Sequence, residues 1–216
     1  MIIYKTVRDE ADAEQIIEKS RFIAHVKPVC TREEADKFLA DVRGRFKDAT
    51  HNVPAFVIGD KFQIQWGSDD GEPQGTSGAP MVQMLVKEGI TNVAVVVTRY
   101  FGGIKLGTGG LVRAYTSSAK LGLEAAGICS VMETVRLSVR VDYTYLAKIQ
   151  NMASERLTYE ETDTPESKIS AVNYSDKVDI DLLTLPAQRD NVWSLIGNIT
   201  SGTVELLEER ASLEKV

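Results

Sequence analysis

The alternation of apolar and polar residues predicts strands in the first part of the chain. Phe22, Ala24 and Val26 point to one side of residues 21–27, which is the pattern of a half-buried strand. The β-branched run at 93–98 is typical of a strand buried on both faces. We therefore expect a sheet in this part, with at least one strand covered on both sides.

Start and stop signals place helices and a hairpin between these strands. Thr31 followed by Glu34 is a capping box, so we expect a helix there with Phe38, Leu39 and Val42 facing inward. Further helices are expected at 79–88 and 111–126, ended by Gly89 and Gly127, and a two-residue hairpin at Gly59-Asp60 between strands 53–58 and 61–66.

The last third of the chain has another order of elements: strand, helix, two strands, helix, strand. The expected ranges are 135–141, 143–155, 157–161, 172–185 (with a break at 175–176 left open), 186–200 and 203–207. This βαββαβ order is that of a ferredoxin-like split βαβ sandwich. The patterns together predict an α+β protein of two domains, 1–132 and 133–216.

Charge and glycine divide near the same place. The net charge of −6 comes from 25 Lys+Arg and 31 Asp+Glu. Residues 1–132 hold 16 of each kind, whereas 133–216 hold 9 and 15, and ten of the 16 glycines lie between Gly67 and Gly110. The acidity therefore disfavours indiscriminate nucleic-acid binding, but it does not disfavour a local site in the neutral first domain.

Composition disfavours several classes of protein. No apolar run approaches the ~18–20 residues of a membrane helix, and the charged N-terminal residues leave no room for a secretory signal. Two histidines and two distant cysteines give neither a zinc spacing nor a disulfide framework. We expect a reduced, cytoplasmic protein with no membrane partner, no metal and no cofactor.

Residues 67–78 form a polar loop with four glycines and three carboxylates. Asp69, Asp70 and Glu72 could hold Mg²⁺ through oxygen ligands, although the order is not that of an EF-hand. We favour the alternative of a solvated acidic turn in which Thr76 or Ser77 caps the next helix. A loop this rich in glycine is costly to order, and such loops in compact domains are often functional.

A second glycine-rich segment, 97–115, follows the buried strand and opens a helix, so its amides can converge on an anion. It lies in a stretch, 89–123, that has no Asp or Glu. The cations there are Arg99, Lys105, Arg113 and Lys120, and the interleaved aromatics are Tyr100, Phe101 and Tyr115. This composition suits phosphate contacts beside stacked, unpaired bases. Neither a P-loop nor a dinucleotide motif is complete, so tight turns with Tyr100 and Phe101 in the core are an equal alternative.

Two shorter segments complete the candidate binding set. Lys19 and Arg21 precede the first strand, and His51 and Asn52 could line a cleft, although a lone loop histidine more often makes a local hydrogen bond. The full set is Lys19, Arg21, His51, Asn52, Asp69, Asp70, Glu72, Arg99, Tyr100, Gly102, Gly103, Lys105, Gly107, Gly109, Gly110, Arg113 and Tyr115. No catalytic residue is assigned.

These segments resemble the YigZ/IMPACT family, in its bacterial YigZ-type branch. The matching motifs are Lys-Ser-Arg-Phe at 19–22, Ala-Thr-His-Asn at 49–52, the acidic loop at 69–78 and, most specifically, 97–115. The resemblance implies an N-terminal α+β domain like the second domain of a small-subunit ribosomal protein and domain IV of elongation factor G. It implies a ferredoxin-like second domain similar to domain V of that factor, and a ribosome- or nucleic-acid-linked role, because eukaryotic IMPACT proteins regulate translation under stress.

Three functions remain open. In the first, a non-enzymatic, translation-linked regulator binds RNA or the ribosome through phosphate contacts from Arg99, Lys105 and Arg113 and stacking on Tyr100 or Tyr115, while the acidic domain faces a protein partner. In the second, a Mg²⁺-dependent enzyme acts on a nucleotide or phosphorylated small molecule. The third is a protein-interaction module without a nucleic-acid role. The lack of an evident nucleophile favours the first.

Overall fold

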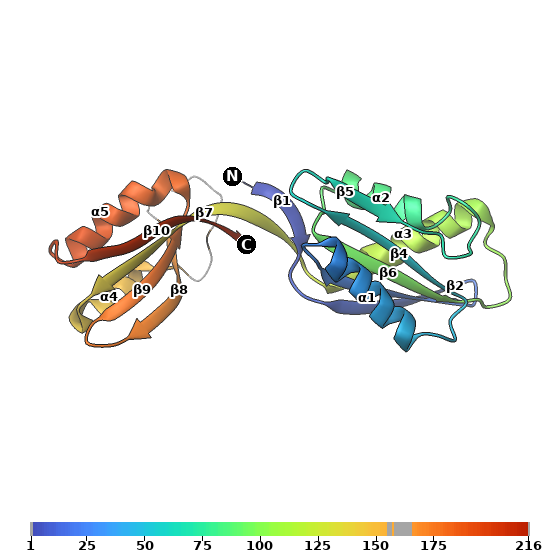
Figure 1. Cartoon of the computed structure of the whole chain (residues 1–216), viewed down its shortest axis with the longest axis horizontal. Coiled ribbons are helices and arrows are strands. Elements are labelled where there is room, and N and C mark those ends of the chain that lie inside the picture. Colours follow the sequence, from blue (N-terminus) through green and yellow to red (C-terminus); the bar gives the residue numbers. More distant parts are fainter. Residues whose placement is uncertain (1, 155–156, 158–165, 216) are drawn as a thin grey trace. The chain divides into compact units, whose positions relative to one another are not determined.

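The computed structural model describes residues 2–154, 157 and 166–215. The chain divides into two compact units, one of Tyr4–Ser130 and the other of Met1–Ile3 with Val131–Val216 (Figure 1). Both units combine helices with antiparallel strands, so the α+β class is confirmed. The sequence pattern did not predict that Ile2 and Ile3 join the second unit.

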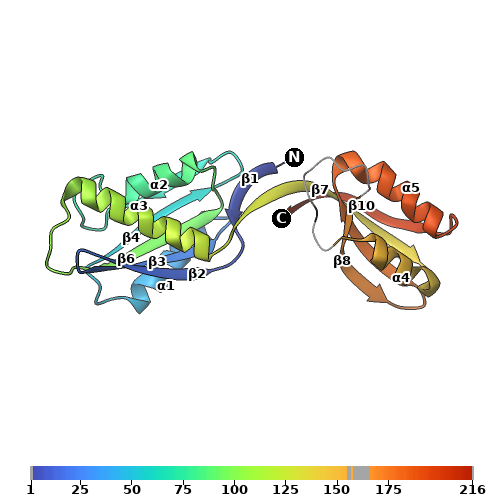
Figure 2. The same cartoon turned by 180° about the vertical axis from the view of Figure 1, so that it is seen from behind.

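The first unit is a five-stranded antiparallel sheet between helices. Its strand order is β2-β3-β6-β4-β5. The strands are β2 (Ala11–Ile17), β3 (Ser20–Pro28), β4 (His51–Ile58), β5 (Ile64–Gly67) and β6 (Val93–Tyr100), and the helices are α1 (Arg32–Arg45), α2 (Gly78–Lys87) and α3 (Gly107–Ala125). Figures 1 and 2 show α1 on one face of the sheet and α2 with α3 on the other.

Covering both faces buries most residues of the central strands β3, β4 and β6. β6 is buried from Val93 to Arg99, as its β-branched sequence predicts. The half-buried pattern expected for β3 is wrong, because Ile23 and His25 are buried as well as Phe22, Ala24 and Val26. The cause is α1, which packs Phe38, Leu39 and Val42 over the second face of the sheet.

The two-residue hairpin expected at Gly59-Asp60 is also wrong. Ile58 pairs with Ile64, so five residues separate β4 from β5. Phe62 takes a positive φ of 57°, donates its backbone N–H to the carbonyl of Gly59 and packs against the core. Burial of this aromatic ring therefore takes residues 61–63 out of the expected strand.

The helix signals are largely confirmed. The Thr31 hydroxyl accepts a hydrogen bond from the backbone N–H of Glu34 at 3.2 Å, whereas the Glu34 carboxylate accepts from the backbone of Cys30 instead of Thr31. Gly89 and Gly127 have the positive φ expected after a helix. The third helix begins at Gly107, four residues before the expected start, so the end of the glycine-rich segment is the first turn of α3.

The second unit confirms the βαββαβ order. Its elements are β7 (Ile128–Val141), α4 (Tyr143–Met152), β8 (Ser167–Tyr174), β9 (Val178–Thr184), a short 3₁₀ turn η1 (Pro186–Gln188), α5 (Arg189–Ile199) and β10 (Glu205–Lys215). β9 lies between β7 and β8, β10 pairs with β7 on the other side, and β1 (Ile2–Val7) also neighbours β7. The expected strand 172–185 is two strands, and the strand expected at 157–161 lies outside the described residues except for Leu157.

A series of hydrogen-bonded polar side chains, buried except for the half-exposed Asp12, crosses the sheet of the first unit. His25 Nδ1 lies 2.7 Å from the Asp12 carboxylate, and its Nε2 lies 3.2 Å from the Thr98 hydroxyl. The same hydroxyl lies 2.7 Å from Asn52 Oδ1. Burial lowers the pKa of His25, and the hydrogen bond to Asp12 offsets this only in part. The fold therefore favours the neutral imidazole.

Acidification from pH 7.5 to 5.5 is expected to destabilise the first unit through His25. Below an ordinary histidine pKa of about 6.5, the unfolded chain takes up a proton that the folded chain resists. The free energy of unfolding therefore falls with pH, by at most about 1.4 kcal/mol per pH unit from this group. Urea unfolding, followed by Trp66 fluorescence in a Trp193→Phe background, measures the slope.

The histidine itself provides the control. His25→Gln is expected to flatten the pH slope over this range, whereas Asp12→Asn, which removes the group that favours the charged imidazole, is expected to keep it. Equal slopes for the wild type and His25→Gln would show that His25 does not carry the effect.

Candidate functional site

Two of the sequence motifs meet at Ser20. Its Oγ accepts hydrogen bonds from the backbone N–H of Gly102 at 3.2 Å and from Arg99 Nη2 at 3.3 Å. A Cβ atom on Gly102 would lie 2.0 Å from the backbone carbonyl of Lys19. Glycine is therefore required at 102 for the β6–α3 segment to lie against the turn before β3.

The acidic loop is joined to the same place by a buried ion pair. Arg99 Nη1 lies 2.6 Å from Glu72 Oε1, and both side chains are about 95% buried. The Tyr115 hydroxyl donates to the same oxygen at 2.8 Å. Burial, together with the nearby Glu72 carboxylate, holds the pKa of Tyr115 far above its usual range. The pair fixes the loop against β6 and α3.

The other two carboxylates of the loop have structural partners. Asp69 accepts from the Ser77 hydroxyl and from the backbone N–H groups of Gly75, Ser77 and Gly78. Asp70 accepts from the backbone of Asn52 and pairs with Arg43. Among the described residues no three His, Cys, Asp or Glu side chains are grouped to hold a metal ion. The three carboxylates thus bind three different sets of donors.

The caps expected for α2 are wrong. The Ser77 hydroxyl donates to Asp69, and the Thr76 hydroxyl donates to the carbonyl of Pro73, so neither caps the helix. Asp69 takes that role, because it accepts from the first backbone N–H groups of α2 across the loop. A cap eight or nine residues before the helix cannot be found from local sequence spacing.

His51 is held at the edge of the loop in one orientation. Its Nδ1 lies 2.8 Å from the backbone carbonyl of Asp70, which can only accept, so Nδ1 carries the hydrogen. Nε2 lies 3.8 Å from Glu72 Oε1. In the neutral ring, Nε2 is therefore a hydrogen-bond acceptor beside the buried carboxylate.

These residues close a cavity of about 450 Å³ at the N-terminus of α3, which we call the α3 cavity. Its lining residues are Thr50, His51, Glu72, Pro73, Arg99, Phe101, Lys105, Leu106, Gly107, Thr108 and Leu111. Arg99 Nε is buried and has no hydrogen-bond partner among the described residues. No side chain caps the first turn of α3. The cavity thus joins the acidic loop, His51 and the glycine-rich segment.

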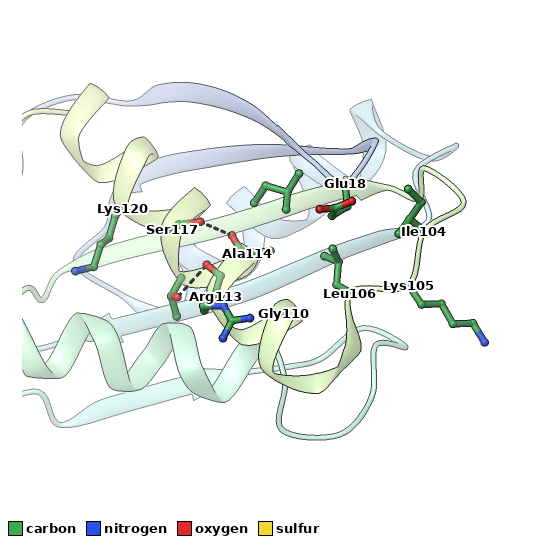
Figure 3. A pocket seen from close by; sticks show the side chains of 11 residues that line it. Glu18, Ile104, Lys105, Leu106, Gly110, Arg113, Ala114, Ser117 and Lys120 are labelled. Atoms are coloured by element: carbon green, nitrogen blue, oxygen red, sulfur yellow. Dashed lines mark hydrogen bonds between the residues drawn. The ribbon is translucent and has the colours of Figure 1, made fainter.

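A second depression, of about 660 Å³, follows the exposed side of α3, and we call it the cationic groove. It is lined by Ile17, Glu18, Ile104, Lys105, Leu106, Gly110, Arg113, Ala114, Thr116, Ser117 and Lys120. Figure 3 shows Lys120, Arg113 and Lys105 following one another along it. Lys120 pairs with Glu88, whereas Arg113 and Lys105 have no ion pair among the described residues.

Several expected roles need correction. Tyr115 is fully buried, so it cannot stack on a base, and Arg99 is enclosed with Glu72, so it cannot reach an RNA phosphate at the surface. Tyr100, the other residue expected to stack on a base, donates a hydrogen bond from its hydroxyl to Asp48 at 3.0 Å. Phe101 was an alternative core residue, yet it is 47% exposed.

Other expected site residues lie apart from the α3 cavity. Arg21 pairs with Glu14 at 2.7 Å, Lys19 is exposed with a positive φ of 64°, and Asn52 belongs to the polar series with His25. Gly103 and Gly109 line neither depression. The sequence set omitted Lys120, although it lies seven residues after Arg113, close to two turns along one helix face.

The fold and these depressions define a class: a two-unit α+β protein whose glycine-rich strand–loop–helix segment lines a mainly apolar cavity that also holds a few polar groups. The Impact N-terminal domain model matches residues 18–123. The chain is 37% identical over 213 residues to the IMPACT family member YvyE of Bacillus subtilis, which covers 98% of this chain and 94% of that protein. The chain belongs to the IMPACT family.

Two further comparisons agree with this assignment. The IMPACT family member YigZ of Escherichia coli is 37% identical over 141 residues, covering 64% of this chain and 69% of that protein. A crystal structure of a protein described as hypothetical has a TM-score of 0.56 and 29% identity, covering 94% of this chain and 96% of its own. No helix in the described part of the chain is long and apolar enough to cross a membrane.

Proposed function

We propose that this chain is a translation-linked regulatory protein that binds RNA through the cationic groove. Membership of the IMPACT family supports the link to translation, because the eukaryotic proteins that the sequence resembles regulate translation. The groove supports RNA as the ligand. The acidic second unit stays a predicted surface for a protein partner.

The observation that carries the proposal is the arrangement of Lys105 and Arg113. Neither has an ion pair among the described residues, and Figure 3 shows them spread along the groove instead of meeting at one point. Separated cations suit successive phosphates of a chain better than a single phosphate group. Glu18 is the groove's acidic residue, so the lining keeps a net positive charge.

The test is RNA affinity as a function of salt. Lys105→Ala/Arg113→Ala is expected to weaken binding of a labelled, mixed-sequence single-stranded RNA about tenfold or more at low salt. The salt slope should fall by about 1.4, since each phosphate contact on a single strand contributes about 0.7. Fluorescence anisotropy between 50 and 200 mM salt measures both, and co-sedimentation with ribosomes tests RNA in its assembled form.

A matched control removes the same charge elsewhere on the first unit. Lys47 and Lys61 are exposed and lie outside the groove, so Lys47→Ala/Lys61→Ala is expected to keep the affinity and the slope. Equal losses in the two double variants, or binding that does not depend on salt, would refute the groove as the RNA site.

A further inference from the structure

We propose that the α3 cavity binds one unpaired nucleotide unit, a nucleobase with its 5′-phosphate. The unit is either a free nucleoside monophosphate or the 5′-terminal nucleotide of an RNA. The second case deepens the proposed function and rests on it, whereas the first does not. The α3 cavity and the cationic groove lie on two sides of the first turns of α3 and share Lys105 and Leu106.

One end of the cavity suits the phosphate. Gly107 and Thr108 open α3 there, and no side chain caps the helix, so their backbone N–H groups lack a partner of that kind. Lys105 lines the same end and has no ion pair among the described residues. A helix N-terminus and a lysine together attract an anion. The Glu72 charge does not oppose it strongly, because Arg99 and Tyr115 neutralise and hydrogen-bond that carboxylate.

The buried guanidinium of Arg99 gives an independent indication of a ligand. Two of its nitrogens are used, by Glu72 and Ser20, but Nε has no acceptor among the described residues. Buried N–H groups are rarely left without a partner, and this one belongs to a side chain that lines the α3 cavity. An acceptor atom is therefore missing beside the cavity, at a place other than the first turn of α3.

The rest of the cavity suits a nucleobase. Phe101 is 47% exposed, and its ring lies 5.4 Å from the Arg99 guanidinium carbon, so one face is supported and a base can stack on the exposed side. Pro73 and Leu111 add apolar wall, and His51 Nε2 can accept a hydrogen bond from a ribose hydroxyl or a base amine. The volume, about 450 Å³, lies in the range of small-molecule sites.

Calorimetric titration of the full chain tests the ligand class. The probes are AMP and UMP, with adenosine, ribose 5-phosphate and inorganic phosphate as partial ligands. We expect a single saturable site for the monophosphates, with every partial ligand at least tenfold weaker. Ribose 5-phosphate binding as tightly as AMP would overturn the base site. Adenosine binding as tightly would overturn the phosphate site, and absence of saturable binding by AMP and UMP would overturn the inference.

Variants separate the cavity from the groove. Phe101→Ala removes a partly exposed ring and is expected to lower the affinity for AMP about tenfold. The affinity for ribose 5-phosphate and the salt slope of RNA binding are expected to stay unchanged. Arg113 lines only the groove, so Arg113→Ala is expected to reduce the salt slope of RNA binding and to leave the affinity for AMP unchanged. Loss of AMP binding in Arg113→Ala, or unchanged binding in Phe101→Ala, would contradict a separate nucleotide site.

The source of the nucleotide is resolved by comparing RNAs that differ at one end. If the unit is an RNA end, 5′-phosphorylated RNA binds more tightly than 5′-hydroxyl RNA, AMP competes for the difference, and Phe101→Ala abolishes it. If the natural ligand is a free nucleoside monophosphate, AMP binds and the two RNAs have equal affinities. Saturable AMP binding by a chain that binds no RNA would refute the proposed function while supporting the nucleotide site.

Discussion

Glu72→Gln is expected to lower the free energy of unfolding of the first unit by about 3–5 kcal/mol. The substitution keeps the size of the side chain and an oxygen that can accept from Tyr115, but it removes the charge opposite Arg99. In this variant the Arg99 guanidinium stays buried but loses its counter-ion. The free-energy cost of removing its charge from water is then no longer offset by attraction to a carboxylate. The loss should therefore exceed that of an ordinary hydrogen bond.

Two variants test this cause. Arg43→Ala breaks an ion pair to the same loop whose side chains are 44% and 27% exposed, and it should cost at most about 1 kcal/mol. Glu72→Gln/Arg99→Met removes both charges and is expected to recover most of the stability, since neither side chain is then a buried ion without a counter-ion. Urea midpoints by Trp66 fluorescence give the values. If Glu72→Gln lowered the free energy of unfolding by less than about 1 kcal/mol, water would have to reach the Arg99–Glu72 pair, and the proposed cause would be wrong.

The buried pair shows how far the sequence could be interpreted. The acid-free stretch 89–123 predicted a local excess of four cations, but Arg99 and Lys120 pair with Glu72 and Glu88, which lie outside it. Composition along a chain records neighbours in sequence, whereas the charge of a site depends on neighbours in space. The same limit applies to Tyr115, whose position between cations suggested stacking and whose ring is in the core.

Local signals were more reliable where the cause is local. The Thr31 cap, the glycines after α2 and α3, and the buried β6 depend on residues within one element, and each was predicted. The errors arise where a distant element decides the outcome. α1 covers the second face of β3, and the core draws Phe62 out of the expected hairpin. The α3 cavity likewise depends on contacts between four segments that no spacing along the chain reveals.

Asp69→Ala is expected to lower the free energy of unfolding of the first unit by about 2–4 kcal/mol. It is also expected to weaken ligand binding in the α3 cavity. Ser77 and Gly78 are buried, and their backbone N–H groups would lose the acceptor that lies 3.1 and 2.9 Å away. Each buried donor left without a partner costs about 1–3 kcal/mol. Burial alone would raise the pKa of Asp69, but the hydrogen bonds from the Ser77 side chain and the loop backbone hold it below its ordinary value. The carboxylate is therefore charged in the fold, and its contribution is lost as the pH falls through the acidic range below about 4.

The effect on binding follows from where Asp69 lies in the loop. Its carbonyl accepts from the backbone N–H of Glu72 at 2.9 Å, so the turn that it organises also places the wall of the α3 cavity. Asp69→Ala is expected to weaken AMP at least tenfold at a temperature where the variant is folded, with RNA affinity in the cationic groove unchanged. Asp69→Asn keeps one acceptor oxygen and should lose less on both measures. Equal loss of AMP and RNA binding would indicate that the whole unit, and not this loop, has been disturbed.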